Sequence, residues 1–128
     1  MSKISVIGSG SWGTALAVLL SKNGHNVILW SRVKEKAKKI AEDKENKEYL
    51  PGIILSDNIN VTYRDSDILK SNMIILAVPS KAVRETTKKF LPYLLENQII
   101  VNVAKGIEEG SLLRLSQVIK ETAPFCRV

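Results

Sequence analysis

Five short runs of apolar residues, rich in valine and isoleucine, recur along the chain. Glycine, proline or polar residues bound each run, which is typical of β-strands. The run that ends at Pro79 is apolar throughout, and this favours a strand buried on both faces. The predicted strands are Ile4–Ile7, Val27–Trp30, Ile59–Tyr63, Met73–Val78 and Ile99–Val103.

The segments between these strands carry apolar residues at helical spacing. The first helix is predicted to bury a face formed by Ala15, Leu16, Val18, Leu19 and Leu20. Pro92 falls inside a later helical segment and predicts a kink or a restart there. The predicted helices are Thr14–Lys22, Lys34–Asn46, Ser66–Lys70, Val83–Leu95 and Leu112–Thr122, with Tyr49–Gly52 as a loop.

Strands and helices therefore alternate along the whole chain. Parallel strands need crossovers of this kind, and right-handed crossovers place helices over both faces of an open sheet. The pattern predicts an α/β fold of the Rossmann type, doubly wound, with a mostly parallel sheet and helices on both faces. No repeat or linker divides the chain, so residues 1–128 are expected to form one domain.

The stretch GSGSWGTALA follows the first predicted strand and opens the first predicted helix. Its glycines fit the spacing G-x-G-x-x-G, and each has a separate task. Gly8 allows the tight turn, Gly10 lets the backbone approach a pyrophosphate, and Gly13 lets the helix pack closely on the strand. The helix start then directs free N–H groups and a partial positive charge at the anion. The sequence predicts a dinucleotide site at this turn.

The end of the second predicted strand bears on which dinucleotide is bound. An acidic residue at this point would bond the ribose 2′-hydroxyl and repel a 2′-phosphate. The sequence instead reads Trp30-Ser31-Arg32, with no acid before Glu35. Ser31 can bond a hydroxyl or a phosphate, and Arg32 can pair with a 2′-phosphate or stack on adenine. NADP is therefore expected to be accepted, and NAD remains open.

Composition narrows the classes of protein that fit. The chain has 128 residues, 45% of them hydrophobic, and a formal net charge of +6. Acids are interspersed with the bases, which favours solvated helix faces and a small phosphorylated ligand over nucleic acid. The apolar runs are too short for membrane insertion or a signal peptide. The single cysteine, Cys126, favours a reducing cytoplasm, and no set of metal ligands is predicted.

Lys105 follows the last predicted strand at its carboxyl end, where open α/β sheets place their ligands. A lysine in this position can attract a phosphate or stabilise charge on a reacting oxygen. His25 is interpreted as a turn residue, and Cys126 is given no chemistry. Four basic residues of one helix are interpreted as a solvated face: Lys81, Arg84, Lys88 and Lys89.

Several stretches resemble, in order and spacing, those of the bacterial NAD(P)-dependent glycerol-3-phosphate dehydrogenases. Trp12 inside the glycine turn and the pair Lys105-Gly106 make the resemblance specific. It extends over the whole chain and matches the N-terminal, cofactor-binding part of that family. The matching stretches are Gly8–Ala17, Leu29–Arg32, Tyr49–Gly52, Ala77–Ser80 and Ala104–Glu108.

The resemblance implies a role for each matching position. Ser11 and Trp12 would line the cofactor at the turn, and Arg32 would hold its adenosine end. Tyr49 would lie near the cofactor across the cleft. Lys105 would reach both the nicotinamide and the substrate. Two further residues, beyond the fourth strand, would flank the nucleotide: Pro79 and Ser80.

The reaction that the resemblance implies is hydride exchange between NAD(P)H and dihydroxyacetone phosphate, giving sn-glycerol 3-phosphate for phospholipid synthesis. In this family a lysine of a C-terminal helical domain is the proposed acid–base group, so no certain catalytic residue is assigned here. That domain is absent from the 128 residues. The chain alone is expected to bind a dinucleotide without turnover, and a homodimer of the full-length enzyme is allowed.

Two alternatives remain open at this point. One is the cofactor domain of another two-domain reductase, of the 6-phosphogluconate or ketopantoate type, against which Trp12 and Lys105-Gly106 argue. The other is a non-catalytic dinucleotide-sensing module, which could be complete at this length. Such modules commonly have an acid at the end of the second strand, and this chain has none.

Overall fold

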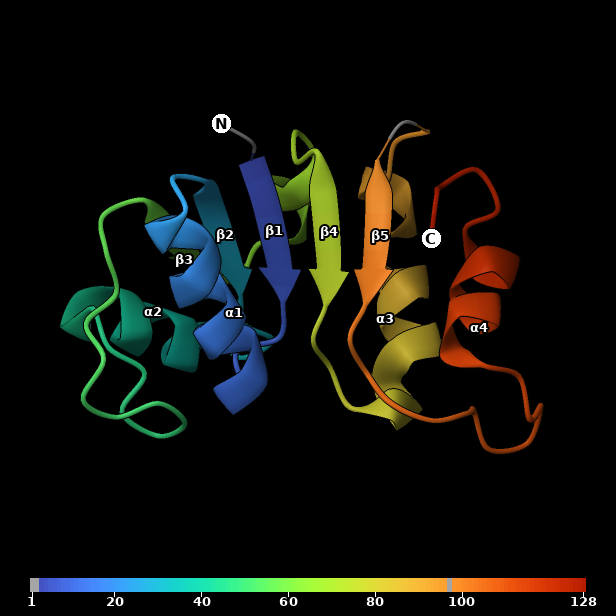
Figure 1. Ribbon diagram of the computed structural model, residues 1–128, viewed down its shortest axis with the longest axis horizontal. Coiled ribbons are helices and arrows are strands. Elements are labelled where there is room, and N and C mark those ends of the chain that lie inside the picture. Colours follow the sequence, from blue (N-terminus) through green and yellow to red (C-terminus); the bar gives the residue numbers. More distant parts are fainter. Residues whose placement is uncertain (1–2, 97) are drawn as a thin grey trace.

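The computed structural model describes residues 3–96 and 98–128. Its centre is a five-stranded sheet in the order β3-β2-β1-β4-β5, with every neighbouring pair parallel (Figure 1). Near the end of the chain, Arg127 adds one parallel bridge to Ile99 on the outer side of β5. The strands are β1 (Lys3–Ile7), β2 (Asn26–Trp30), β3 (Ile59–Thr62), β4 (Met73–Leu76) and β5 (Ile99–Asn102).

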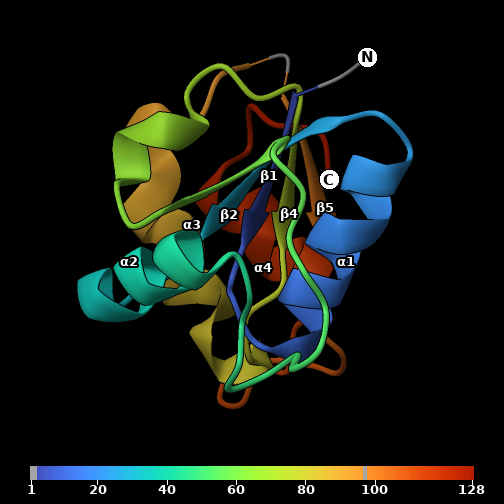
Figure 2. The ribbon, with the colours of Figure 1, turned by 90° about the vertical axis from the view of Figure 1, so that its left-hand side faces the viewer.

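Helices connect the strands and cover both faces of the sheet, as Figure 2 shows most clearly. This arrangement confirms the predicted Rossmann-type class. The α-helices are α1 (Ser11–Lys22), α2 (Lys34–Asp43), α3 (Val83–Phe90) and α4 (Leu115–Thr122). Three short 3-10 segments accompany them: η1 (Asp65–Ile68), η2 (Ser80–Ala82) and η3 (Leu91–Tyr93).

Strand side chains alternate between two hydrophobic clusters, one on each face of the sheet. On one face, Val6 and Leu29 pack with Ala17 of α1 and Ile40 of α2. On the other face, β-strand residues pack with η1, α3, η3 and α4, and Phe90 lies edge-on to Trp30 with ring centroids 4.8 Å apart. Both faces are therefore sealed, which explains why the run in β4 is apolar at every position.

Some predicted helix boundaries were wrong by a few residues. The helix predicted over Lys34–Asn46 ends at Asp43, because Lys44 takes a left-handed backbone conformation with φ 52°. The helix predicted from Leu112 begins at Leu115, because the preceding residues fold back as a short hairpin. The break predicted at Pro92 is confirmed, since α3 ends at Phe90 and η3 follows it.

The buried face of α1 also differs from the prediction. Leu19, placed on the core side by its spacing, is 55% exposed. The residues that α1 buries are small: Gly13, Thr14, Ala17 and Ser21. Small side chains let the helix axis approach the sheet closely, so the larger residues Leu16, Val18 and Leu20 pack at the flanks of the contact.

The strands run in one direction, so their carboxyl ends form one edge of the sheet (Figure 1). The chain leaves β1 toward β2 on one side and enters β4 on the other, so the order reverses between β1 and β4. Open α/β sheets bind ligands at such a reversal, outside the carboxyl ends of the strands. This edge is where the predicted site residues should meet.

The packing of α1 on the sheet should fail when Gly13 gains a side chain. A Cβ at Gly13 would overlap the carbonyl of Gly8, which is backbone and cannot move aside cheaply. We expect Gly13→Ala to lower the free energy of unfolding by about 1–3 kcal/mol, although alanine otherwise favours helix. Urea unfolding measures this effect. Gly10→Ala is the control, because nothing lies within 4 Å of its Cβ position; equal stability of the two variants would contradict the argument.

Candidate dinucleotide-binding site

The glycine turn joins β1, β2 and β4 at their carboxyl ends. Gly8 N–H donates to the carbonyl of Trp30 at 3.0 Å, and Ala77 N–H donates to the carbonyl of Ile7 at 2.8 Å. Gly8 has φ 117°, and a Cβ there would overlap the carbonyl of Ala77. Only glycine fits this position, both for its backbone angle and for lack of space.

The other two glycines of the motif have opposite surroundings. Gly13 lies against Gly8, and this contact holds the start of α1 on the turn. Gly10 faces open space and immediately precedes α1. The geometry agrees with the separate tasks predicted for the three glycines: Gly8 and Gly13 are required for packing, and Gly10 keeps a surface of bare backbone accessible.

The start of α1 offers unpaired N–H donors beside Gly10. The first bond of this helix runs from Thr14 N–H to the Gly10 carbonyl at 3.0 Å, so the three preceding N–H groups have no partner inside the helix. No side chain caps this end and no acid lies in its first turn. Ser11 and Trp12 are exposed, Trp12 by 60%. These features suit a pyrophosphate, which needs donors and no competing negative charge.

Ser31 and Arg32 leave the sheet next to the glycine turn. Ser31 is buried, donates its N–H to the carbonyl of Thr62 at 2.8 Å and accepts a hydrogen bond from the Ser9 hydroxyl at 3.0 Å. Arg32 is exposed. The structure therefore brings the predicted adenosine-side residues beside the glycine turn, with the Arg32 side chain on the accessible side.

Asn46 holds the turn from the opposite side, and sequence reasoning missed it. Its side chain is 2% exposed, and its amide nitrogen donates to the Ser9 carbonyl at 2.7 Å and to the Thr14 hydroxyl at 2.8 Å. Its side-chain oxygen accepts from Tyr49 N–H at 3.3 Å. Because Asn46 was placed in a helix, its sequence context gave only one signal, an amide residue just before a proline-glycine loop.

Tyr49 is brought to the glycine turn by this amide. It is 43% exposed, and the Lys36 ammonium lies 5.8 Å from the centre of its ring. Tyr49, Ser9 and Asn46 line one small cavity of about 80 Å³. Tyr49 thus lies beside the glycine turn, and its predicted contact with the cofactor stays a prediction.

Pro79 and Ser80 follow β4, the neighbour of β1. Pro79 is exposed and Ser80 half-buried, and the carbonyl of Pro79 accepts from Ala82 N–H at 2.8 Å to close the turn into η2. Because Ala77 remains bonded to β1, these residues emerge at the same edge as the glycine turn. That they flank a ligand there stays a prediction.

Lys105 lies exposed in the loop after β5. The Asn102 side chain bonds both the N–H and the carbonyl of Ala104, at 3.0 and 3.1 Å, and so shapes the end of the strand. Gly106 has φ 101°, which turns the chain sharply, and Ile107 then pairs with Arg114 in a short hairpin. Lys105 is therefore the residue that this loop leaves at the edge of the sheet.

Arg84 fixes this loop to the rest of the domain, contrary to its interpretation as part of a solvated face. Its side chain is 23% exposed and binds both carboxylate oxygens of Glu108, at 2.8 and 2.9 Å. It also contacts Glu121 of α4 at 3.1 Å. Lys89 pairs with Asp65 at 3.4 Å but stays exposed, as a solvated face requires. Helical spacing identified the face, but the partners come from distant parts of the chain.

Charge pairing shifts the titration of this clamp. Hydrogen bonds from Arg84 and then Ser111 lower the pKa of Glu108 from 4.5 to about 2, and the bonds to Glu108 raise the pKa of Arg84. Glu108 therefore stays ionised in the folded protein at pH values where a free glutamate would be protonated.

The structure also shows the surroundings of His25 and Cys126, the two residues to which the sequence analysis assigned no chemistry. His25 N–H donates to the Leu20 carbonyl at 3.2 Å, and the His25 carbonyl accepts from Asn58, which fits a turn. Cys126 is buried and unbridged, and burial raises the pKa of its thiol. Within residues 3–96 and 98–128, no cluster of side chains suits a metal ion. In the same residues, no helix is long and apolar enough to cross a membrane.

The parallel sheet, the glycine turn and the donors at the start of α1 define a Rossmann-type dinucleotide-binding domain. Comparison with known families narrows this class. The model of the NAD-dependent glycerol-3-phosphate dehydrogenase N-terminus matches residues 3–126. The chain belongs to this family, as the matching stretches predicted.

Relatives agree with this assignment. The NAD(P)+ glycerol-3-phosphate dehydrogenase of Pelotomaculum thermopropionicum is 50% identical over 122 residues, covering 94% of this chain and 35% of that protein. That of Bacillus velezensis is 49% identical over 125 residues, covering 97% and 36%. The crystal structure of the Coxiella burnetii glycerol-3-phosphate dehydrogenase matches with a TM-score of 0.87 and 29% identity, covering 95% and 38%. The chain spans just over a third of the length of these relatives.

We expect the stability of the domain to depend on the hydrogen bonds that the Asn46 amide donates, and not only on the size of this side chain. Asn46→Asp keeps the shape and the acceptor for Tyr49, but it places an oxygen against the Ser9 carbonyl where a donor stood. We expect a loss of about 1–3 kcal/mol in unfolding free energy at pH 7, the cost of an unpaired buried polar group. Urea unfolding measures it, with the exposed Asn26→Asp as control. Equal effects at the two positions would refute a special role for Asn46.

Acid should release the clamp on the Lys105 loop. Because the folded-state pKa of Glu108 is lowered, its stabilisation is full above about pH 4.5 and disappears as the pH falls toward 2. The melting temperature of Glu108→Gln should therefore lie below that of the parent at pH 7. The difference should shrink as the pH falls from 4.5 to 2. Glu109→Gln, which changes an exposed neighbour, should show neither effect; a difference independent of pH would rule out the ion pair as its source.

Proposed function

We propose that this chain is the cofactor-holding domain of an NAD(P)-dependent glycerol-3-phosphate dehydrogenase. The whole enzyme would interconvert dihydroxyacetone phosphate and sn-glycerol 3-phosphate and so feed glycerophospholipid synthesis. The observation that carries the proposal is the bare backbone at Gly10, next to unpaired N–H groups at the start of α1. The family match supports it.

The residues at this edge would divide the cofactor among them. The N–H groups of Ser11 and Trp12, beside the bare backbone of Gly10, would hold the pyrophosphate, and the exposed Trp12 indole would form a wall beside it. Ser31 and Arg32 would hold the adenosine end. Tyr49, fixed by Asn46, would lie on the α2 side. Two residues after β4 would flank the nucleotide: Pro79 and Ser80.

Lys105 would act at the nicotinamide end. When bound, the reduced nicotinamide supplies hydride to the ketone carbon of the substrate. The ketone oxygen gains negative charge as hydride arrives, and the Lys105 ammonium is free to stabilise that charge or to bind the phosphate. Its exposed position after β5, on a loop clamped through Glu108, supports this role. We assign no proton donor within this chain.

Residues 1–128 would form one domain of a longer, two-domain enzyme. The relatives are almost three times as long as their matching part, which supports a separate substrate domain. That domain would carry the acid–base lysine and most of the phosphate site. We propose that the enzyme works in the cytoplasm, which the single, unbridged cysteine of these 128 residues favours, and that the full-length enzyme forms a homodimer.

Binding of NADH and NADPH to this chain tests the proposal. Gly10→Ala should weaken the affinity for both cofactors roughly tenfold or more, because a methyl group would occupy the approach of the pyrophosphate. Its melting temperature should stay unchanged, since the Cβ meets no protein atom. Nucleotide fluorescence titration gives the affinities.

Ser116→Ala, on the exposed surface of α4, is the matched control and should bind like the parent. The parent chain mixed with NADH and dihydroxyacetone phosphate should show no turnover. Failure of the parent to bind either cofactor would overturn the proposed function. Normal turnover by these 128 residues would overturn the need for a second domain.

A further inference from the structure

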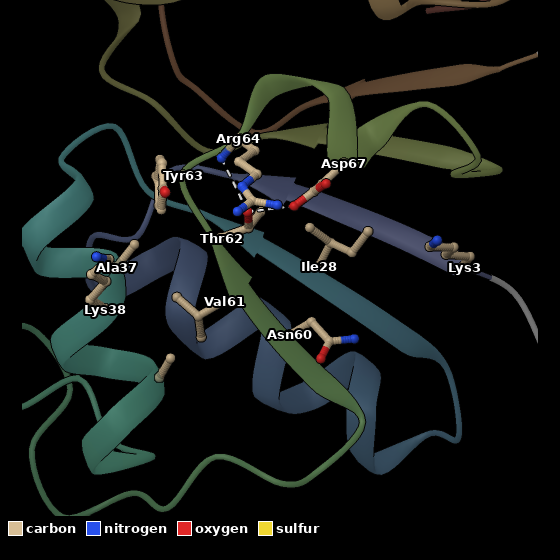
Figure 3. Close-up of a pocket in the computed structure, with 11 residues that line it drawn as sticks. Lys3, Ile28, Ala37, Lys38, Asn60, Val61, Thr62, Tyr63, Arg64 and Asp67 are labelled. Carbon is tan, nitrogen blue, oxygen red and sulfur yellow. Dashed lines mark hydrogen bonds between the residues drawn. The ribbon is translucent and has the colours of Figure 1, made fainter.

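A group of positive side chains surrounds Tyr63 where β3 ends. The Lys34 ammonium lies 5.4 Å from the centre of the Tyr63 ring, and the Arg64 guanidinium carbon lies 5.9 Å from it. Lys34 is the first residue of α2, so the group joins two elements that are far apart in the chain. Figure 3 shows Tyr63 and Arg64 at the end of β3, with Lys38 on α2 across from them.

This group lies beside the adenosine end of the proposed cofactor site. Trp30 of β2 pairs with Thr62 of β3, and Ser31 N–H donates to the Thr62 carbonyl at 2.8 Å. Ser31-Arg32 and Tyr63-Arg64 therefore leave the sheet next to each other. Since the Ser31 hydroxyl also bonds Ser9 in the glycine turn, the group continues the predicted site rather than forming a separate one.

The positive charge of the group is not neutralised within the domain. Across the described part of the chain, no carboxylate forms an ion pair with Lys34, Lys38 or Arg64. The nearby Asp67 carboxylate instead accepts a hydrogen bond from the Thr62 hydroxyl at 2.6 Å. A hydrogen bond from Arg64, followed by the charge of Lys34, lowers the pKa of the Tyr63 hydroxyl, which reflects the positive potential there. Like charges held together in this way attract an anion.

The chemistry of the group matches a phosphate monoester. A guanidinium donates two parallel hydrogen bonds to phosphate oxygens, an ammonium supplies a compact charge, and a phenol adds a hydroxyl donor. No acid follows β2 to repel such a group. We propose that Lys34, Tyr63 and Arg64 bind the 2′-phosphate of NADP and so favour NADPH over NADH. This proposal rests on the proposed function of the glycine turn.

The test compares nucleotides that differ in the 2′-phosphate. Calorimetry gives the affinity of the chain for adenosine 2′,5′-bisphosphate, 5′-AMP and inorganic phosphate at one ionic strength. Lys34→Gln and Arg64→Gln should each weaken the bisphosphate roughly tenfold, the effect of losing a charge-assisted hydrogen bond. Their affinity for 5′-AMP should change less than about twofold. Tyr63→Phe should show a smaller loss with the same selectivity, because only a neutral hydroxyl is removed.

Lys22→Gln is the matched control, since it removes one exposed positive charge at the far end of α1. It should leave both affinities at the parent values. All of the altered side chains are exposed or half-buried, so each variant is expected to fold. Melting temperatures measure whether it does.

Three outcomes overturn the inference. In the first, 5′-AMP binds the parent but the bisphosphate binds no tighter. This result would support the proposed nucleotide-binding function and contradict the 2′-phosphate site. In the second, the variants lose both nucleotides equally, or inorganic phosphate binds as tightly as the bisphosphate, and the group is then a general anion site. In the third, the parent binds neither nucleotide, and the proposed function falls together with the inference.

Discussion

The contact between Gly8 and Gly13 sets the geometry on which the rest of this domain depends. The carbonyl of Gly8 occupies the space that a Cβ of Gly13 would need, and Gly8 itself lies against the carbonyl of Ala77. The ends of β1 and β4 and the start of α1 therefore meet at short range, because neither glycine carries a side chain. The start of α1 is thereby held at the point where the strand order reverses, and open α/β sheets generally bind their ligands at such a point.

Polar contacts and apolar packing have separate tasks in this fold. The two hydrophobic clusters fix the layers and include Leu55 and Leu113 from the loops, but neither cluster includes Tyr49 or Lys105. Asn46 fastens the loop of Tyr49, and the pair Arg84–Glu108 fastens the loop of Lys105. Directional bonds suit this task because they fix the position of a loop without requiring a large buried area. Two of the loops that carry predicted site residues are thus fixed by polar contacts.

The sequence was sufficient to predict the sheet, because its strands are mostly apolar and are bounded by glycine, proline or polar residues. It was also sufficient for the glycine turn, whose tasks depend on local spacing. The sequence did not predict the surroundings of a side chain where these depend on residues far away along the chain. Leu19 has the spacing of a buried helix position, but it is exposed because α1 buries small residues instead. Arg84 has the spacing of an exposed helix position, but it forms an ion pair with Glu108 of a distant loop. The role of Asn46 could not be predicted from the sequence, because its acceptors, Ser9 and Thr14, are more than thirty residues away.

The same reasoning explains why a choice between NAD and NADP is incomplete when it is read from β2 alone. Arg32 lies two residues after β2, and its type could be read from the sequence, but the sheet order places β3 beside that strand end. The residues after β3 therefore leave the sheet beside those after β2, and Lys34 in the first turn of α2 lies 5.4 Å from the centre of the Tyr63 ring. Electrostatic selection for a 2′-phosphate is a sum over all charges within a few ångströms, whatever their distance along the chain. In this domain that sum depends on strand pairing, because pairing decides which loop ends stand side by side.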